Sequence, residues 1–230
     1  MDSQSDGADP KRDLLEVLVL FFFIVPSVII SFFSLETENP RFPILALSVI
    51  FQDLALGSFV FFFLWRNGEP LTRIGWEFSG LKREVALGAG LFLPVVVGVS
   101  LIEAAFGRLG ASSHMSHIPK FLTAKGPSEI FLACVLVIVV AVTEETIFRG
   151  YLLLRFENLT GSRAASVIIS SALFALGHAY EGLANVGAIG VLGIILSLIF
   201  LWRKSLVSLV VIHLLIDFYP LVLLPMEGIK

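Results

Sequence analysis

The sequence predicts an all-α fold, a polytopic bundle of about seven transmembrane helices. Of its 230 residues, 57% are hydrophobic and only 15% are charged, whereas about a quarter of the residues of a soluble domain are charged. The mean hydropathy is +0.92. Several apolar runs reach the length of about 20 residues that a helix needs to cross a bilayer. These observations exclude an ordinary soluble domain.

Seven apolar runs along the chain are long enough to be membrane-spanning helices. They cover residues 14–34, 43–65, 85–106, 129–156, 164–180, 182–201 and 205–224. The fourth run would be about 42 Å long as a single helix, which exceeds the hydrocarbon core of a bilayer. We therefore expect it to tilt, to break or to project beyond the membrane.

The chain divides into three parts. Residues 1–13 are polar and are predicted to be a disordered tail. Residues 14–127 hold the N-terminal transmembrane helices and loops, and residues 128–224 hold the motifs described below. Lys11 and Arg12 precede the first apolar run as they would in a signal peptide. No small-residue cleavage site follows that run, so we expect it to be retained as the first span.

The distribution of basic residues predicts how the chain is oriented in the membrane. With the N-terminus in the cytoplasm, ten Lys and Arg residues fall on cytoplasmic segments and five on outer segments, with Arg149 left out. This bias agrees with the positive-inside rule. The net charge is −3 and no basic tract is present, so nucleic acid is not an expected partner. The short chain and short loops favour a multi-pass protein of a bacterial inner membrane.

The fourth run ends in the central motif of the chain, the sequence Ala-Val-Thr-Glu-Glu-Thr-Ile-Phe-Arg-Gly-Tyr at 141–151. Ionisable side chains inside a bilayer cost about 2.5–3.5 kcal/mol each and are usually functional. Glu145 and Arg149 lie one helical turn apart and can pair, whereas Glu144 points about 100° away. One carboxylate is thus neutralised and the other is free. The alternative is a solvated helix end outside the membrane.

Two later runs add further ionisable groups. His178 lies at the end of the fifth run, and His213 and Asp217 share a helical face in the seventh. A carboxylate beside imidazoles can activate water directly as a general base or through a bound divalent metal. A second imidazole could stabilise the oxyanion of a tetrahedral intermediate. No Gly-x-Ser-x-Gly motif supports a serine nucleophile, so the pattern indicates water-mediated peptide hydrolysis within the membrane.

Asp53 lies inside the second apolar run and has two interpretations. An intramembrane carboxylate is a candidate site residue. The other interpretation is a hydrogen bond that packs one helix against another. We favour the packing interpretation, because no second ionisable group is near Asp53 in the sequence.

Three motifs lie in order on the late spans: Glu-Glu-x-x-x-Arg at 144–149, Phe-x-x-x-His at 174–178 and His-x-x-x-Asp at 213–217. In this order they resemble the CPBP intramembrane metalloproteases. That family includes the type II CAAX prenyl endopeptidases and the bacteriocin-processing or immunity proteins of the Abi family. The resemblance covers residues 128–220, so it identifies residues 128–224 as a catalytic core between the late helices.

The resemblance implies a role for each residue of the first two motifs. Glu144 would activate water together with His178. Glu145 would be held by Arg149 and would shape the site. The implied function is an intramembrane endopeptidase that acts on membrane-associated peptides or protein tails, including lipidated ones, in contact with membrane lipid.

The third motif departs from the CAAX endopeptidases, which tend to have Asn where this chain has Asp217. His213 and residue 217 would bind the carbonyl oxyanion or complete a metal site. An ionised carboxylate cannot donate a hydrogen bond, so Asp217 favours orienting His213 or binding metal. The implied cofactor is one divalent metal ion, with zinc favoured and Glu144, His178 and His213 as candidate ligands, and no organic cofactor is expected.

Two other functions are compatible with the residues. The first is a non-catalytic binding or immunity protein on the same scaffold, in which the motifs would have no catalytic role. The second is a small transporter that uses the Glu, His and Asp side chains as a proton relay. Transporters commonly show internal repeats, and none is visible in this sequence.

One feature of the expected topology conflicts with the mechanism. Glu144 is expected on the inner side of its span, whereas His178 is expected towards the outer end of the next. The two must meet if they activate one water. Either the fourth run is broken, or the fifth span begins deeper in the bilayer than residue 164.

Overall fold

The computed structural model describes residues 9–34, 41–108, 123–179 and 183–227, and every regular element in these ranges is helical. The predicted all-α bundle is therefore confirmed. In chain order the helices are α1 (Pro10–Ser34), α2 (Phe42–Asn67), η1 (Leu71–Ile74), α3 (Leu81–Arg108), α4 (Gly126–Glu144), η3 (Glu145–Leu152), α5 (Leu153–Thr160), α6 (Arg163–Gly177), α7 (Leu183–Arg203), α8 (Val207–Phe218), η5 (Tyr219–Leu223) and α9 (Leu224–Glu227).

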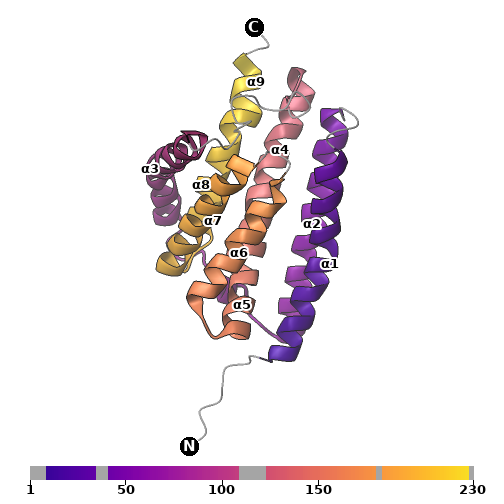
Figure 1. Cartoon of the computed structure of the whole chain (residues 1–230), viewed down its shortest axis with the longest axis vertical. Helices are drawn as coiled ribbons and strands as arrows, with labels where there is room; N and C mark the ends of the chain where they lie inside the picture. The colour runs from indigo at the N-terminus through magenta and orange to yellow at the C-terminus, as the bar shows by residue number, and fades with distance from the viewer. Residues whose placement is uncertain (1–8, 35–40, 109–122, 180–182, 228–230) are drawn as a thin grey trace, which may run out of the picture.

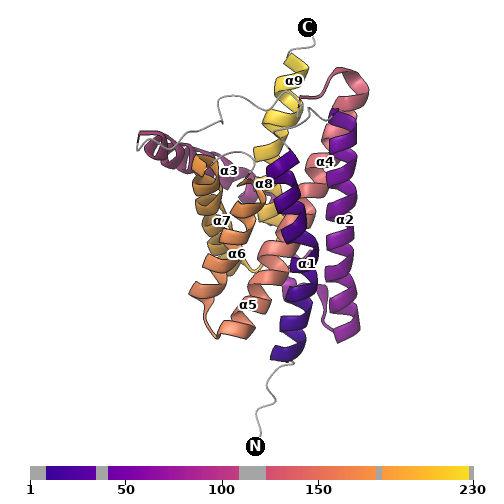
Figure 2. The ribbon, with the colours of Figure 1, turned by 45° about the vertical axis from the view of Figure 1, so that its right-hand side comes forward.

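The bundle is built around one long helix, formed by α4, η3 and α5 in succession (Figure 1). This central helix runs from residue 126 to residue 160 and is 35 residues long. α2 packs along α4, whereas α6 packs on α5 and η3, and α8 packs on α4. α3 packs against α7 and α8 and is strongly inclined to the central helix, as Figure 2 shows.

Five helices within the described residues are long and apolar enough to cross a membrane. They correspond to the second, third, fourth, sixth and seventh predicted spans, and they support a multi-pass integral membrane protein. The fifth predicted span, 164–180, is shorter than expected, because α6 has 15 residues and ends at Gly177. Glycine disfavours a further helical turn. The ring of His178, at Nδ1, also lies 3.0 Å from the carbonyl oxygen of Phe174 in the last turn.

The first helix begins earlier than the sequence indicates. We expected a tail up to residue 13, but α1 starts at Pro10, and the remainder of that tail, residues 1–8, lies outside the described residues. Proline is favoured in the first turn of a helix, since its missing N–H would be unpaired there. Asp13 is buried and needs a partner, so the first turn is fixed by an ion cluster.

This ion cluster, defined as Asp13, Glu16, Glu69 and Arg155, ties α1 and the end of α2 to α5. Arg155 is fully buried, and its Nη2 lies 3.1 Å from Glu16 Oε2 and 3.0 Å from Glu69 Oε2. Its Nη1 lies 3.6 Å from Asp13 Oδ1. The hydroxyl of Tyr151 donates a hydrogen bond to Glu16. The sequence does not indicate this cluster, because its residues lie far apart in the chain.

The connector after α2 packs against the middle of the central helix. A Cβ atom on Gly150 would lie 2.8 Å from the carbonyl oxygen of Ile74, so only glycine permits this approach. Trp76 donates a hydrogen bond through Nε1 to Thr146 Oγ1 at 3.1 Å. These two contacts show that the connector supports the segment that carries the central motif.

Candidate active site

The central motif lies where the long central helix changes from an α-helix to a π-helix. α4 ends at Glu144, and residues 145–152 form a π-helix before α5 continues. Single π turns inside α-helices occur frequently at functional sites. All eight residues of this π-helix are buried, so the motif is not a solvated helix end.

Glu145 is the most enclosed member of the motif. Its side chain has no exposed surface, and its Oε1 lies 2.8 Å from Arg149 Nη1 and 2.8 Å from His213 Nδ1. The pairing of Glu145 with Arg149 is the one that their spacing indicates. One carboxylate oxygen therefore joins the central helix to α8 through two short polar contacts.

The contact with Glu145 fixes the orientation of the His213 ring. With Nδ1 directed at Glu145, Nε2 faces Glu144 Oε2 at 3.7 Å and Asp217 Oδ2 at 3.5 Å. A carboxylate at Nδ1 favours the tautomer that carries a proton there. The sequence suggested that Asp217 orients His213. The structure gives the shorter contact to Glu145 and leaves Asp217 beside Glu144.

Phe174 connects the three parts of the site. The guanidinium carbon of Arg149 lies 4.0 Å from the centre of the Phe174 ring, within the range of a cation–π interaction. The same ring lies edge-on to His213, with centroids 6.1 Å apart, and 5.0 Å from His178. Phe174 belongs to the Phe-x-x-x-His motif, but the sequence gives it no function of its own. Its position one turn before His178 was the available signal.

Glu144 differs from Glu145 in both exposure and partners. The Glu144 side chain is 20% exposed, and its Oε2 has no hydrogen-bond partner among the described residues. His178 on α6 is close enough to interact electrostatically with it. Glu144 is thus a carboxylate that is enclosed by the bundle, faces two imidazoles and is free to accept a proton.

The long central helix resolves the conflict between Glu144 and His178. Glu144 is the last of the 19 residues of α4, and the central helix continues for 16 residues beyond it through η3 and α5. It therefore lies near the middle of the 35-residue central helix rather than at its inner end. α6 starts at Arg163, close to the predicted residue 164, and is short. His178, which directly follows the last residue of α6, therefore lies at the same level of the bundle as Glu144. The fourth run is neither broken nor interrupted by a loop.

Asp53 also faces this site, which the favoured packing interpretation did not anticipate. It is only 7% exposed, and its Oδ2 has no hydrogen-bond partner among the described residues. It interacts electrostatically with Glu144 and His213. The ionisable neighbours of Asp53 come from helices remote in sequence, so the lack of such a group nearby in the sequence did not support the packing interpretation. A polar residue inside an apolar run was the only sequence signal.

The candidate metal-ligating side chains are not arranged as a preformed metal site. Within the described residues, no three His, Cys, Asp or Glu side chains converge closely enough to hold a metal ion. His213 Nδ1 is directed to Glu145, which leaves only Nε2 as a potential ligand atom. The predicted metal ligands Glu144, His178 and His213 lie around one region without forming a coordination sphere.

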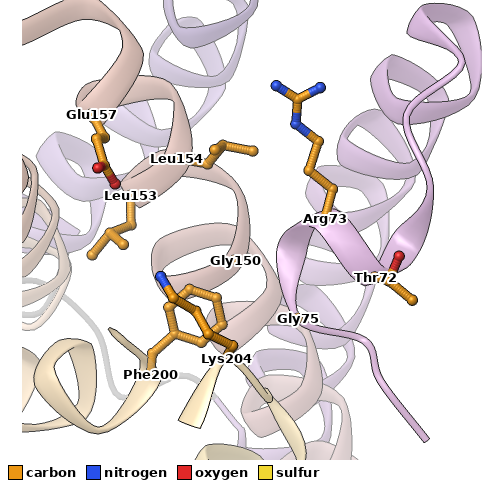
Figure 3. Close-up of a pocket in the computed structure, with 9 residues that line it drawn as sticks. All are labelled: Thr72, Arg73, Gly75, Gly150, Leu153, Leu154, Glu157, Phe200 and Lys204. Carbon is orange, nitrogen blue, oxygen red and sulfur yellow. The ribbon is translucent and has the colours of Figure 1, made fainter. Parts of the chain in front are cut away.

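A separate pocket of about 80 Å³ lies towards the far end of the central helix (Figure 3). Its wall includes Gly150 and Leu153 of the central helix, Arg73 of η1, Phe200 of α7, and Lys204 directly after α7. None of the six predicted site residues lines it. The pocket therefore does not mark the candidate active site.

The fold and the site define a class of protein: a multi-pass membrane protein with an enclosed Glu, Arg and His cluster between its late helices. Residues 126–219 match the family model described as type II CAAX prenyl endopeptidase Rce1-like. This match is consistent with the CPBP resemblance, contains all three motifs and supports a protease at the level of the family. No curated protein and no solved structure matches the chain.

Proposed function

We propose that this protein is an intramembrane endopeptidase in which Glu144 activates water for attack on a peptide bond. The observation that supports this most directly is the contrast between two adjacent carboxylates. Glu145 is fully buried and held by Arg149 and His213, whereas Glu144 is partly exposed and its Oε2 has no hydrogen-bond partner in the part of the chain that the structure describes. The first carboxylate organises the site, and the second is available for proton transfer.

The reaction begins with water beside Glu144. As the water oxygen bonds to the carbonyl carbon, Glu144 accepts its proton as general base. The carbon–nitrogen bond then breaks, and Glu144 returns that proton to the departing amine. His178, on the short α6 helix, stabilises the carboxylate and helps to hold the water. The products are a carboxylic acid and an amine, which exchange a proton to become carboxylate and ammonium.

His213 is the group suited to the developing oxyanion. Its Nδ1 is directed at Glu145, and its Nε2 points towards the side of Glu144. When it carries a proton, Nε2 can donate a hydrogen bond to the tetrahedral oxygen. Asp217 lies 3.5 Å from this nitrogen and favours the protonated ring, because a nearby negative charge stabilises a positive one.

A divalent metal is a second way to activate the same water. Zinc held by Glu144, His178 and His213 would lower the pKa of bound water and polarise the carbonyl group. The described side chains do not form such a coordination sphere, so the steps above use only groups of the chain itself. Metal analysis beside the cleavage assay decides between the two versions.

The substrates we propose are membrane-associated peptides or protein tails, including prenylated tails with a C-terminal CAAX sequence. The family match supports this class, as does the position of the site within a bundle whose surface is largely apolar. We further propose an inner-membrane protein with a cytoplasmic N-terminus. The excess of basic residues at the end of the bundle that carries the N-terminus supports that orientation.

The test compares cleavage by wild-type protein, Glu144→Ala and His178→Ala, each purified in detergent. A mixed peptide library and a prenylated CAAX peptide serve as substrates, with and without a chelator. We expect wild-type cleavage and its loss in both variants, with unchanged elution as folded protein. Normal processing by the variants would overturn the proposal. Absence of cleavage by every sample would instead favour a non-catalytic binding protein on this scaffold.

A further inference from the structure

The carboxylate of Asp53 is a buried titratable group that the proposed reaction does not use. It is carried by α2, outside the segment that matches the family model. α2 and α4 lie side by side (Figure 2). They approach closely where a Cβ atom on Gly57 would lie 3.2 Å from Thr143 Cγ2. Asp53 is one turn from Gly57, and Glu144 follows Thr143, so the contact brings the two carboxylates together.

The surroundings of Asp53 are unfavourable for a structural carboxylate. The residue is 7% exposed, its Oδ2 is unpartnered among the described residues, and a second carboxylate, Glu144, is its neighbour. Buried charges in stable positions are paired or hydrogen-bonded. The ring of His213 also interacts electrostatically with Asp53, but its Nδ1 is already directed at Glu145. An incompletely paired buried carboxylate is expected to oppose folding, which is typical of functional groups.

We propose that Asp53 is a further residue of the active site that stabilises the amine leaving group of the substrate. This inference rests on the proposed function. During hydrolysis the peptide nitrogen gains a proton as the carbon–nitrogen bond breaks, and it departs as an ammonium group. Glu144 is neutral while it carries the proton taken from water, and in that state the neighbouring Asp53 carboxylate can stabilise the positive charge that develops on the nitrogen. Asp53 therefore acts on charge that is absent from the bound substrate.

The first measurement is the thermal unfolding midpoint, which does not depend on any substrate. We compare wild type with Asp53→Asn, Glu144→Gln and the double variant. Ser58→Ala on the same helix is the control, because Ser58 is exposed and its hydroxyl donates a hydrogen bond to the carbonyl oxygen of Leu54, one turn earlier in α2. We expect Asp53→Asn to raise Tm by about 2–4 °C and Ser58→Ala to leave it unchanged. The double variant should gain less than the sum, because either change relieves the same repulsion.

The second measurement is steady-state cleavage of the peptide that wild type processes best. Asp53→Asn should lower kcat by about 10- to 100-fold, less than Glu144→Gln does. KM should stay within about twofold, because an interaction made only in the transition state acts on kcat. Asp53→Glu should restore part of kcat, since it returns the charge. A residue with only a structural role would not lower kcat at constant KM, and its kcat would not be partly restored by Asp53→Glu.

The outcomes separate this inference from the proposed function. A fall in Tm for Asp53→Asn, or additive Tm changes in the double variant, would overturn the inference even if wild type cleaves peptides. A rise in Tm with unchanged kcat would overturn it as well. If wild type cleaves nothing, the proposed function fails, and the leaving-group role fails with it. The non-additive Tm change would then still establish the contact between Asp53 and Glu144.

Discussion

Two buried charge clusters occupy different levels of this bundle, and they differ in how completely their charges are paired. In the ion cluster, Arg155 contacts Asp13, Glu16 and Glu69, and both oxygens of Glu69 accept hydrogen bonds from it. In the candidate active site, Glu144, Glu145 and Asp53 each have one carboxylate oxygen that lacks a hydrogen-bond partner among the described residues. The first cluster uses its charges to hold helices together. We propose that the second keeps charges available for chemistry.

The largest effect is expected from breaking the ion cluster. Arg155→Leu removes the fully buried cation that three buried carboxylates share, and leaves them, among the described residues, only partly exposed arginines such as Arg12 and Arg66. Removing one partner of a buried ion pair costs about 3–5 kcal/mol. We expect little folded protein, measured as the monodisperse fraction in detergent. Arg163→Ala is the control, because its pair with Glu157 is solvent-exposed and is worth about 0–1 kcal/mol.

The second effect, on catalysis alone, is expected at Glu144. Glu144→Gln should reduce peptide cleavage by about 10²–10⁴-fold, the usual contribution of a general base. The unfolding temperature of Glu144→Gln should not fall, because the substitution removes a carboxylate charge whose Oε2 accepts no hydrogen bond from the described residues. An activity loss accompanied by a comparable loss of stability would place Glu144 with the structural charges.

A smaller effect is expected at Phe174, which positions charged groups without carrying a charge. Phe174→Leu removes the ring that contacts Arg149 and separates the two histidines, while most of the apolar volume is kept. We expect cleavage to fall by up to about 100-fold, the scale of a misplacement of about 1 Å. Phe156→Leu is a matched control in the same core. If both variants cleave equally well, Phe174 has only a packing role.

The smallest effect is expected at Asp217, where the chain departs from the CAAX endopeptidases. Asp217→Asn keeps the shape of the side chain, and Glu145 still holds His213 Nδ1. The change replaces one charged contact with a neutral one, a difference of about 1 kcal/mol. Cleavage should therefore change by less than about tenfold. A complete loss of cleavage would show that Asp217, rather than Glu145, controls His213.

The same contrast explains what the sequence could predict. Apolar run length predicted the helices, and the i and i+4 spacing predicted that Glu145 can pair with Arg149. These depend on local geometry. The contact between Glu145 and His213 joins residues 68 apart, and that between Glu69 and Arg155 joins residues 86 apart. Such contacts depend on how the helices pack, which no local spacing encodes.

Asp53 shows most clearly what could not be predicted from the sequence. Its sequence neighbours offer no ionisable partner, so a packing hydrogen bond was the natural interpretation. The partners that decide its role lie on α4 and α8. The level of Glu144 in the membrane was also beyond reach, because the central helix extends further at both ends than the apolar run of 129–156. The added residues are Gly-Pro-Ser at 126–128 and Glu-Asn-Leu-Thr at 157–160, which are mostly polar or helix-capping and do not extend an apolar run.

We propose that one charge cluster serves chemistry and the other serves stability. To separate these roles, unfolding temperature and peptide cleavage are measured on the same samples of wild type, Glu144→Gln and Glu69→Gln. We predict that Glu144→Gln unfolds at or above the wild-type temperature and does not cleave. Glu69→Gln should unfold at a lower temperature, while its folded fraction still cleaves. The account is contradicted if Glu144→Gln cleaves like wild type, or if Glu69→Gln loses cleavage while its stability is unchanged.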